Sequence, residues 1–305
     1  MAQLTANKFS ADTLSYIAAA KNVEIKVKQY CIYFLGFILL LINGAHAQDK
    51  IWTFGVLNQR SISLTAEYWN PILNYVSLTS GVPLRLVLAK TAPETDALIG
   101  HGQFDFIYSN TIYTTSNYSV GYQAFARPIG PTLQGQIVTL QDSPVRTLQD
   151  LAHREVGFPS LVAFTGYVLP MHALAQQGVT VKPIFAGNQE GIMAQLKFGR
   201  VLAAGVNSKV MREYAQRENI AYRVLWTSAP YLDLPIAAHP RVPKKIVAAL
   251  RAAFLGMQHN AEGMKILQAS AALIKQAPPL GYLPTDNREY QNYHDFFHAN
   301  RLKAP

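Results

Sequence analysis

From Ile51 onward, short apolar runs alternate with longer amphipathic stretches through most of the 305-residue chain. Runs such as "IWTFGVL", "PLRLVLA" and "FDFIYSN" have the length and the β-branched or aromatic content of buried strands. Between the first two runs, "SLTAEYWNPILNYVSLTSG" places apolar residues at helical spacing and ends at a glycine. Strands that alternate with helices in this order predict parallel sheets covered by helices, which is an α/β fold.

The alternation continues as a second set of strands and helices that starts near "GQIVTLQ" and ends near "YRVLWTS". The next run, "LPIAAHP", is typical of a strand and is expected to return to the first sheet. We therefore expect one lobe from residues 48–136 and 229–305, and a second, inserted lobe from residues 137–228. Two segments, near residues 132–141 and 227–235, would cross between the lobes as hinges. A cleft between such lobes is the usual place for a ligand.

Residues 1–47 differ from the rest of the chain. Several lysines precede the apolar run "YCIYFLGFILLLI", and "NGAHA" follows it. A basic flank, a short apolar core and a small-residue ending are the pattern of a secretory signal peptide. The run is shorter than the roughly 20 apolar residues of a membrane-spanning helix, although a retained anchor is the alternative. We expect a signal peptide over residues 1–47 and a soluble periplasmic product.

Composition excludes several classes of protein. Half of the residues are hydrophobic and 15% are charged, which is typical of a globular chain. The single cysteine, Cys31, lies inside the predicted signal, so the exported chain would have no disulfide and no thiolate site. The basic residues are scattered and not interleaved with aromatic residues, which argues against nucleic acid as a partner.

Signals for catalysis are weak. The sequence contains no G-x-S-x-G, P-loop or H-E-x-x-H motif. His294 and His298 are four residues apart and would share a helical face, but no acids accompany them in a defined arrangement, so a solvated terminal helix is favoured over a metal site. We therefore predict a protein that is not an enzyme, with no catalytic residues, no metal and no cofactor.

Open α/β sheets bind ligands at the carboxyl ends of their parallel strands. This rule selects Arg60 after the first strand, and Tyr108, Ser109 and Asn110 at the end of the third. Arg60 could pair with an anion or lie on the surface, and Tyr108 could offer its hydroxyl or ring to a ligand or pack in the sheet. We predict these four residues as ligand-binding.

The stretch "GFPSLVAFTGYVLPMHAL" is typical of a strand end, a turn and the opening of a helix. A helix start offers unpaired N–H groups and the positive end of the helix dipole, so it is a suitable seat for an anion. Thr165 could donate its hydroxyl to a ligand or cap its own helix. Phe164 could line the pocket or belong to the core behind the turn.

Six motifs in order give the chain a family resemblance: "AEYWNPILNYVSLTSGVPLRL", "GQFDFIYSN", "RTLQDLAHREVGFPS", "TGYVLP", "GNQEGIMAQLKFGRVLAAGV" and "HPRVP". Together they resemble the phosphonate- and phosphite-type periplasmic substrate-binding proteins of ABC importers. The resemblance runs from about residue 51 to about residue 273. It implies a type II periplasmic-binding-protein fold, in which two lobes close on a small ligand and deliver it to an inner-membrane permease.

The resemblance also implies ligand-binding positions, and this chain departs from the family at several of them. The family's run of small hydroxyls at the helix start, Ser-Thr-Ser-Gly-Tyr, corresponds here to Ala163, Phe164, Thr165, Gly166 and Tyr167. Its Gly-Ser-His at the next strand end corresponds to Gly187, Asn188 and Gln189, where Asn188 could instead cap the following helix. An acidic residue common in the family is replaced by Leu202.

The leading expectation is a monomeric periplasmic binding protein that delivers a phosphate- or phosphonate-like oxyanion to an ABC importer. If Phe164 and Leu202 face the cleft, the same fold would suit a neutral or apolar ligand, such as a lipid or sterol, and another transporter could receive it. A third possibility is a ligand-sensing partner of a membrane receptor.

The predicted signal peptide gives a direct test. N-terminal sequencing of the exported protein is expected to begin at Gln48, because signal peptidases cut after small residues such as those of Ala45-His46-Ala47. Recovery of the intact chain from the inner membrane would show a retained anchor instead.

Overall fold

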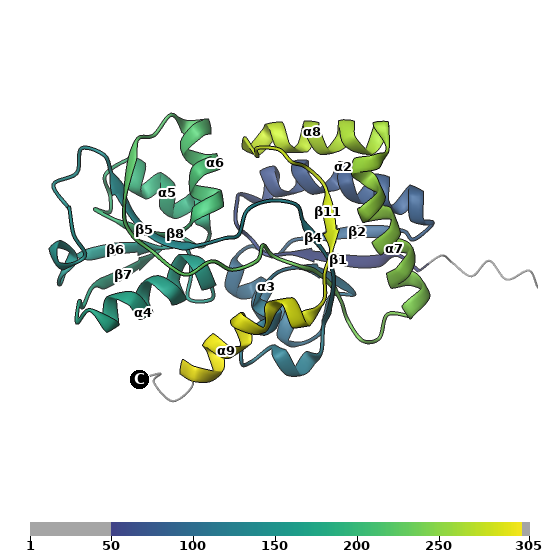
Figure 1. Cartoon of the computed structure of the whole chain (residues 1–305), viewed down its shortest axis with the longest axis horizontal. Helices are drawn as coiled ribbons and strands as arrows, with labels where there is room; N and C mark the ends of the chain where they lie inside the picture. Colours follow the sequence, from purple (N-terminus) through teal and green to yellow (C-terminus); the bar gives the residue numbers. More distant parts are fainter. Residues whose placement is uncertain (1–49, 301–305) are drawn as a thin grey trace, which may run out of the picture. The chain divides into compact units, whose positions relative to one another are not determined.

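The structure is a computed structural model that describes residues 50–300; the predicted signal peptide lies outside these residues. The strands form two sheets (Figure 1). The first has the order β11-β4-β10-β3-β1-β2 and contains β1 (Trp52–Val56), β2 (Leu84–Val87), β3 (Phe106–Tyr108), β4 (Gln123–Pro128), β10 (Ile236–Ala238) and β11 (Tyr282–Pro284). The second has the order β7-β6-β8-β5-β9 and contains β5 (Gly135–Leu140), β6 (Glu155–Phe158), β7 (Lys182–Phe185), β8 (Ala204–Asn207) and β9 (Tyr222–Thr227).

Helices cover both faces of each sheet (Figure 1). Against the first sheet lie α2 (Ile62–Ser80), α7 (Lys244–Gly256) and α8 (Ala261–Ile274) on one face, and α3 (Ala92–Gly100) and α9 (Gln291–Asn300) on the other. Against the second sheet lie α5 (Gln189–Lys197) and α6 (Ser208–Glu218) on one face, and α4 (Leu169–Gln176) on the other. We call the first sheet with its helices the first lobe, and the second sheet with its helices the second lobe.

Local sequence explains where the helices begin and end. The Ser61 side chain accepts a hydrogen bond from the Leu64 N–H and so caps α2, which ends at Gly81 in the left-handed conformation. In the same way, Asn207 closes β8 and caps α6 by accepting from the N–H groups of Lys209 and Val210. The cap matters for the site, because it directs the first turn of α6 toward the first lobe.

The sheets are mixed rather than wholly parallel. β1 is parallel to β2 and β3, while β10 returns to the first sheet and pairs antiparallel with β3 and β4. In the second sheet β6 is parallel to β7 and β8, while β5 is antiparallel to β8 and β9. The predicted α/β fold class is confirmed.

Sequence patterning missed two strands of the first sheet. β4 and β11 pair antiparallel with each other at its edge, and neither stands out as an alternating apolar run. The stretch "TLQDLAHR", whose sequence favours a short helix, forms only a 3₁₀ turn, Gln149–Leu151. The conformation of such elements depends on tertiary contacts more than on local periodicity.

Two segments cross between the lobes: residues 129–134 lead from β4 to β5, and residues 228–235 lead from β9 to β10. They run antiparallel and are bridged by two backbone hydrogen bonds between Leu133 and Tyr231, with N···O distances of 2.6 and 2.8 Å. The N–H of Gly135 also donates to the Ser228 hydroxyl. The crossings therefore behave as one paired hinge rather than as two independent linkers.

Candidate ligand-binding site

A helix begins a few residues after β6 of the second lobe. The chain makes a π-helical turn, η4 (Phe164–Val168), that continues into α4. Ala163 occupies the cap position and offers no side-chain cap, and its carbonyl accepts from the N–H groups of Tyr167 and Val168. The N–H groups at the start of such a helix have no carbonyl within the helix to bond, so they are available to a ligand.

A small enclosed cavity faces this helix start, and we call it the helix-start cavity. Its volume is about 20 Å³, and residues of both lobes line it. No charged side chain is among its lining residues, which are Leu57, Asn58, Gln59, Ala92, Asn110, Pro159, Ser160, Val162, Ala163, Phe164, Thr165, Gln189, Asn207 and Leu234. The cavity is therefore polar but electrically neutral.

Buried hydrogen-bond donors line this cavity. Ser160 is buried, and its hydroxyl has no hydrogen-bond partner among residues 50–300. Thr165 is also buried and lines the same cavity. Gln189 accepts from the Asn207 N–H through Oε1 at 3.0 Å, which leaves its NH₂ group over Gly166. Such a cluster suits a ligand group that only accepts hydrogen bonds.

Phe164 forms part of the cavity wall, but its ring lies in an aromatic cluster. The ring centroid is 4.8 Å from that of Tyr231 on the second crossing and 4.7 Å from that of Tyr293 on α9. Phe296 and Phe297 of α9 surround it further. Of the two roles considered for Phe164, its ring therefore serves the core, and it joins the helix start to the C-terminal helix.

A second cavity, of about 30 Å³, lies beside the first and shares Leu57, Gln59 and Asn207 with it. We call it the ion-paired cavity. Its remaining lining residues are aromatic, aliphatic, neutral polar or charged: Val56, Arg60, Thr65, Tyr68, Trp69, Tyr108, Leu133, Lys209, Val210, Asp233, Ile274 and Gln276. The two cavities thus form adjacent parts of one cleft between the lobes.

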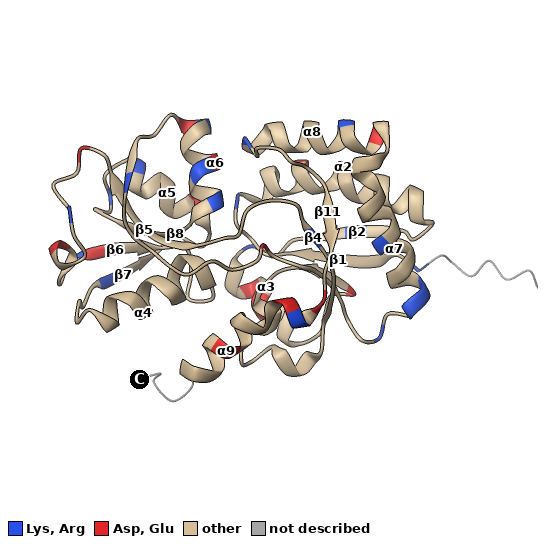
Figure 2. Ribbon diagram, in the orientation of Figure 1, with Lys and Arg blue, Asp and Glu red and all other residues tan. Residues whose placement is uncertain are grey.

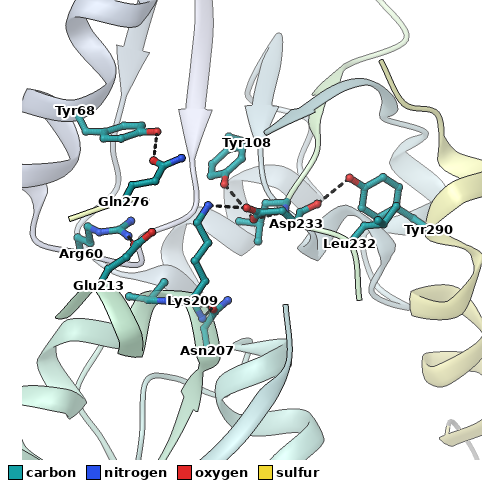
Figure 3. A network of polar contacts seen from close by, with 12 residues as sticks. Arg60, Tyr68, Tyr108, Asn207, Lys209, Glu213, Leu232, Asp233, Gln276 and Tyr290 are labelled. Carbon is teal, nitrogen blue, oxygen red and sulfur yellow. Dashed lines mark hydrogen bonds and ion pairs between the residues drawn. The ribbon is translucent and has the colours of Figure 1, made fainter. Parts of the chain in front are cut away.

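Ion pairs cross this cleft from α6 (Figure 3). The Lys209 ammonium lies 2.7 Å from the Asp233 carboxylate, to which the Tyr108 hydroxyl also donates at 3.3 Å. The Arg60 guanidinium pairs with Glu213, and the two groups are in direct hydrogen-bond contact. Figure 2 shows that α6 carries both basic and acidic residues. Both pairs link a residue of α6 to a residue of the first lobe or of the second crossing, so they hold the cleft closed.

Burial and charge set the protonation of these groups. Burial lowers the pKa of Lys209, but the carboxylates of Asp233 and Glu213 outweigh it and leave that pKa raised. Burial, together with the Asp233 charge, raises the pKa of Tyr108 well above its usual value. Burial also raises the pKa of Glu213, and Arg60 and Lys209 offset this only in part. At neutral pH Lys209 is therefore a cation and Tyr108 a neutral donor.

Most of the ligand-binding residues predicted from the sequence line one of the two cavities. Asn110, Ala163, Phe164, Thr165 and Gln189 line the helix-start cavity, and Arg60 and Tyr108 line the ion-paired cavity. Gly166 lies under the Gln189 amide.

Besides Gly166, four of the predicted residues line neither cavity. Ser109 is buried and hydrogen-bonds with Thr111. Tyr167 packs between two phenylalanine rings, Asn188 caps α5 by accepting from the Gly191 N–H, and Leu202 is 37% exposed. Leu202 precedes β8, at the opposite end of that strand from the cleft, so its side chain does not reach a ligand there.

Sequence reasoning missed several residues of the cleft: Tyr68, Trp69, Ser160, Lys209, Glu213 and Asp233. Lys209 follows the carboxyl end of β8, so the rule that ligands bind at strand ends could have identified it. Asp233 lies in an irregular crossing and carries no such signal.

Neither a cluster of metal ligands nor a helix that could cross a membrane is found among the described residues. Among residues 50–300, no three histidine, cysteine or acidic side chains come together as metal ligands would. Within the same residues, no helix combines the length and apolar character that crossing a bilayer demands.

Two lobes joined by paired crossing segments, with a polar cleft between them, are the usual arrangement of a small-molecule binding protein. Residues 54–288 match the profile of a family described as ABC transporter, phosphonate, periplasmic substrate-binding protein. The match covers most of the chain, so the chain belongs to this family. No curated protein sequence matches the chain.

Solved structures share the fold at low sequence identity. The phosphonate ABC transporter binding protein of Pseudomonas aeruginosa is 17% identical, with a TM-score of 0.71 over 84% of this chain and 89% of that one. PhnD1 of Prochlorococcus marinus, solved with methylphosphonate, is 14% identical, with a TM-score of 0.69 over 84% of this chain and 100% of that one. A Xanthomonas citri protein bound to chloride is 14% identical, with a TM-score of 0.63 over 83% of this chain and 99% of that one. Such proteins have the type II periplasmic-binding-protein fold.

The position of Phe164 can be tested through stability. Phe164→Ala is expected to lower the free energy of unfolding by about 3–5 kcal/mol, because a buried ring leaves a cavity within the aromatic cluster. Phe198→Ala is the matched control: Phe198 is 74% exposed, and its removal should cost no more than about 0.5 kcal/mol. Urea denaturation measures both, and equal effects would contradict the placement of the Phe164 ring in the core.

Proposed function

We propose that this protein binds a small oxyanion, phosphate or an alkylphosphonate, in the helix-start cavity and delivers it to an ABC importer. The export signal over residues 1–47 would place it in the periplasm, where the members of its family act. The observation that carries the proposal is the buried Ser160 hydroxyl without a partner, beside a helix start.

The chemistry of the cavity supports an acceptor-only ligand. Ser160, Thr165 and Gln189 can each donate one hydrogen bond, and the N–H groups of the first helical turn add others. A hydrogen bond to a charged group contributes roughly 1.5–3 kcal/mol, so a few of them are sufficient for micromolar binding. The absence of charged side chains among the lining residues implies that recognition depends on oriented donors and on the helix dipole.

The hypothesis of an apolar ligand loses its main support. It depended on Phe164 and Leu202 filling the cleft. The Phe164 ring packs instead against Tyr231 and Tyr293, and Leu202 lines neither cavity.

The size of the cleft also favours a compact ligand. Cavities of about 20 and 30 Å³ are each comparable to the space of one to three water molecules. A phosphonate group therefore requires a modest separation of the lobes, followed by closure on the ligand. A lipid or sterol would require a much wider opening.

Delivery to a permease follows from the same hinge. Because the lobes are joined through the bridge between Leu133 and Tyr231, ligand-dependent closure would change their relative orientation as rigid units. A permease that contacts both lobes would then distinguish the loaded protein from the unloaded one. The family to which the chain belongs supports an ABC importer as the recipient.

Removing single donors from the helix-start cavity tests the ligand class. In titration calorimetry, the unaltered protein should bind phosphate or methylphosphonate. Ser160→Ala and Thr165→Val should each weaken that binding about ten- to a hundredfold, because each removes one hydrogen bond to a charged group.

Ser119→Ala is the matched control, since Ser119 is exposed and lines neither cavity, and it should leave the affinity unchanged. The proposal fails if neither anion binds at millimolar concentration, or if the Ser160 and Ser119 variants bind equally well.

A further inference from the structure

The ion-paired cavity lies where the substituent of a bound oxyanion would extend. It adjoins the helix-start cavity through Leu57, Gln59 and Asn207, so a group that leaves the oxyanion seat along the cleft enters it. Its charged lining side chains are two cations, Arg60 and Lys209, and one carboxylate, Asp233. Each cation is paired with a carboxylate, Arg60 with Glu213 and Lys209 with Asp233, so neither carboxylate is free to pair with a cationic substituent.

The Asp233 carboxylate has little capacity left for a ligand. Its Oδ2 accepts from the Lys209 ammonium at 2.7 Å, and its Oδ1 accepts from the Leu234 N–H at 2.7 Å and from the Tyr108 hydroxyl at 3.3 Å. The Asp233 side chain is only 6% exposed. Lys209 thus occupies the position beside Asp233 that the ammonium group of a ligand would otherwise take (Figure 3).

The groove that leads from the surface to the cavity is lined by more basic than acidic residues. A groove of about 360 Å³ shares Lys209 and Gln276 with the ion-paired cavity. Its other charged lining residues are Arg212 and Lys275, which are basic, and Glu213, which pairs with Arg60. A net positive groove attracts anions and repels cationic groups.

We propose that Lys209 is a specificity-determining residue, which admits oxyanions with an uncharged substituent and excludes those whose substituent carries an ammonium group. The inference rests on the proposed oxyanion function and extends it to the substituent of the bound oxyanion. An ammonium placed in this cavity would meet Arg60 and Lys209 and would find the Asp233 carboxylate already paired. A buried cation without a partner is strongly disfavoured.

Two ligands of nearly the same shape test this. Propylphosphonate ends in a methyl group, whereas 2-aminoethylphosphonate ends in an ammonium group. In calorimetry at pH 7, the unaltered protein should bind propylphosphonate at least about tenfold more tightly, because like charges at close range repel by more than 1 kcal/mol. Equal or tighter binding of 2-aminoethylphosphonate would overturn the inference.

Two variants test whether Lys209 causes this preference. Lys209→Met keeps the length of the side chain but removes the ammonium, so Asp233 becomes available and the preference should reverse in favour of 2-aminoethylphosphonate. In the double variant Lys209→Met with Asp233→Asn, the carboxylate is also gone and the preference should return to propylphosphonate. A folded Lys209→Met protein that still prefers propylphosphonate would overturn the role of Lys209.

Methylphosphonate separates this inference from the proposed function. If methylphosphonate binds but the two longer ligands are not distinguished, only the role of Lys209 fails. If none of the three binds, the oxyanion function fails as well. If Lys209→Met does not fold because Asp233 is left unpaired, the double variant decides the question: its preference for propylphosphonate should be weaker than that of the unaltered protein, and an undiminished preference would overturn the role of Lys209.

Discussion

The second crossing segment, residues 228–235, organises both the hinge and the cleft. Its Tyr231 backbone forms the bridge to Leu133, and its Tyr231 ring packs against Phe164 at the helix start. Two residues further on, the Asp233 carboxylate holds Lys209 of the second lobe. The Leu232 and Asp233 carbonyls accept hydrogen bonds from the hydroxyls of Tyr293 and Tyr290. One short segment therefore connects the hinge, the ion pair and the C-terminal helix.

The neutral and the charged groups of the cleft have different roles. The Ser160 hydroxyl is left without an acceptor among the described residues, whereas Lys209 is paired with Asp233 and the Arg60 guanidinium with Glu213, although the Arg60 Nε makes no hydrogen bond there. An incoming anion would gain hydrogen bonds at the helix start without displacing an ion pair. The ion pairs link the lobes and would surround the other end of the ligand. This arrangement favours recognition by geometry over recognition by net charge.

Much of the fold was predictable because strands and helices have distinct apolar periods. The alternation gave the α/β class, and the second set of strands and helices followed by the return strand "LPIAAHP" gave the two-lobed arrangement. β4 and β11 escaped because neither has an alternating apolar pattern and their pairing depends on residues far away in sequence. Within the site, the helix start after β6 was found from the strand-end rule, as were Arg60 and Tyr108. The direction of the Phe164 ring was not predictable, since its partners Tyr293 and Phe296 lie more than a hundred residues further along the chain. Asp233 was missed because it lies in an irregular crossing segment, where neither a periodic pattern nor a strand end marks it.

The most direct test of the central claim is a crystal structure of the protein grown with methylphosphonate. The account predicts that the phosphonate oxygens lie within about 2.7–3.2 Å of the Ser160 hydroxyl and of N–H groups in the first turn that begins at Phe164. The methyl group should then point toward the ion-paired cavity, with Lys209 still bound to Asp233. A phosphonate seated on Arg60 or Lys209, with the Ser160 hydroxyl still unpaired, would contradict the account.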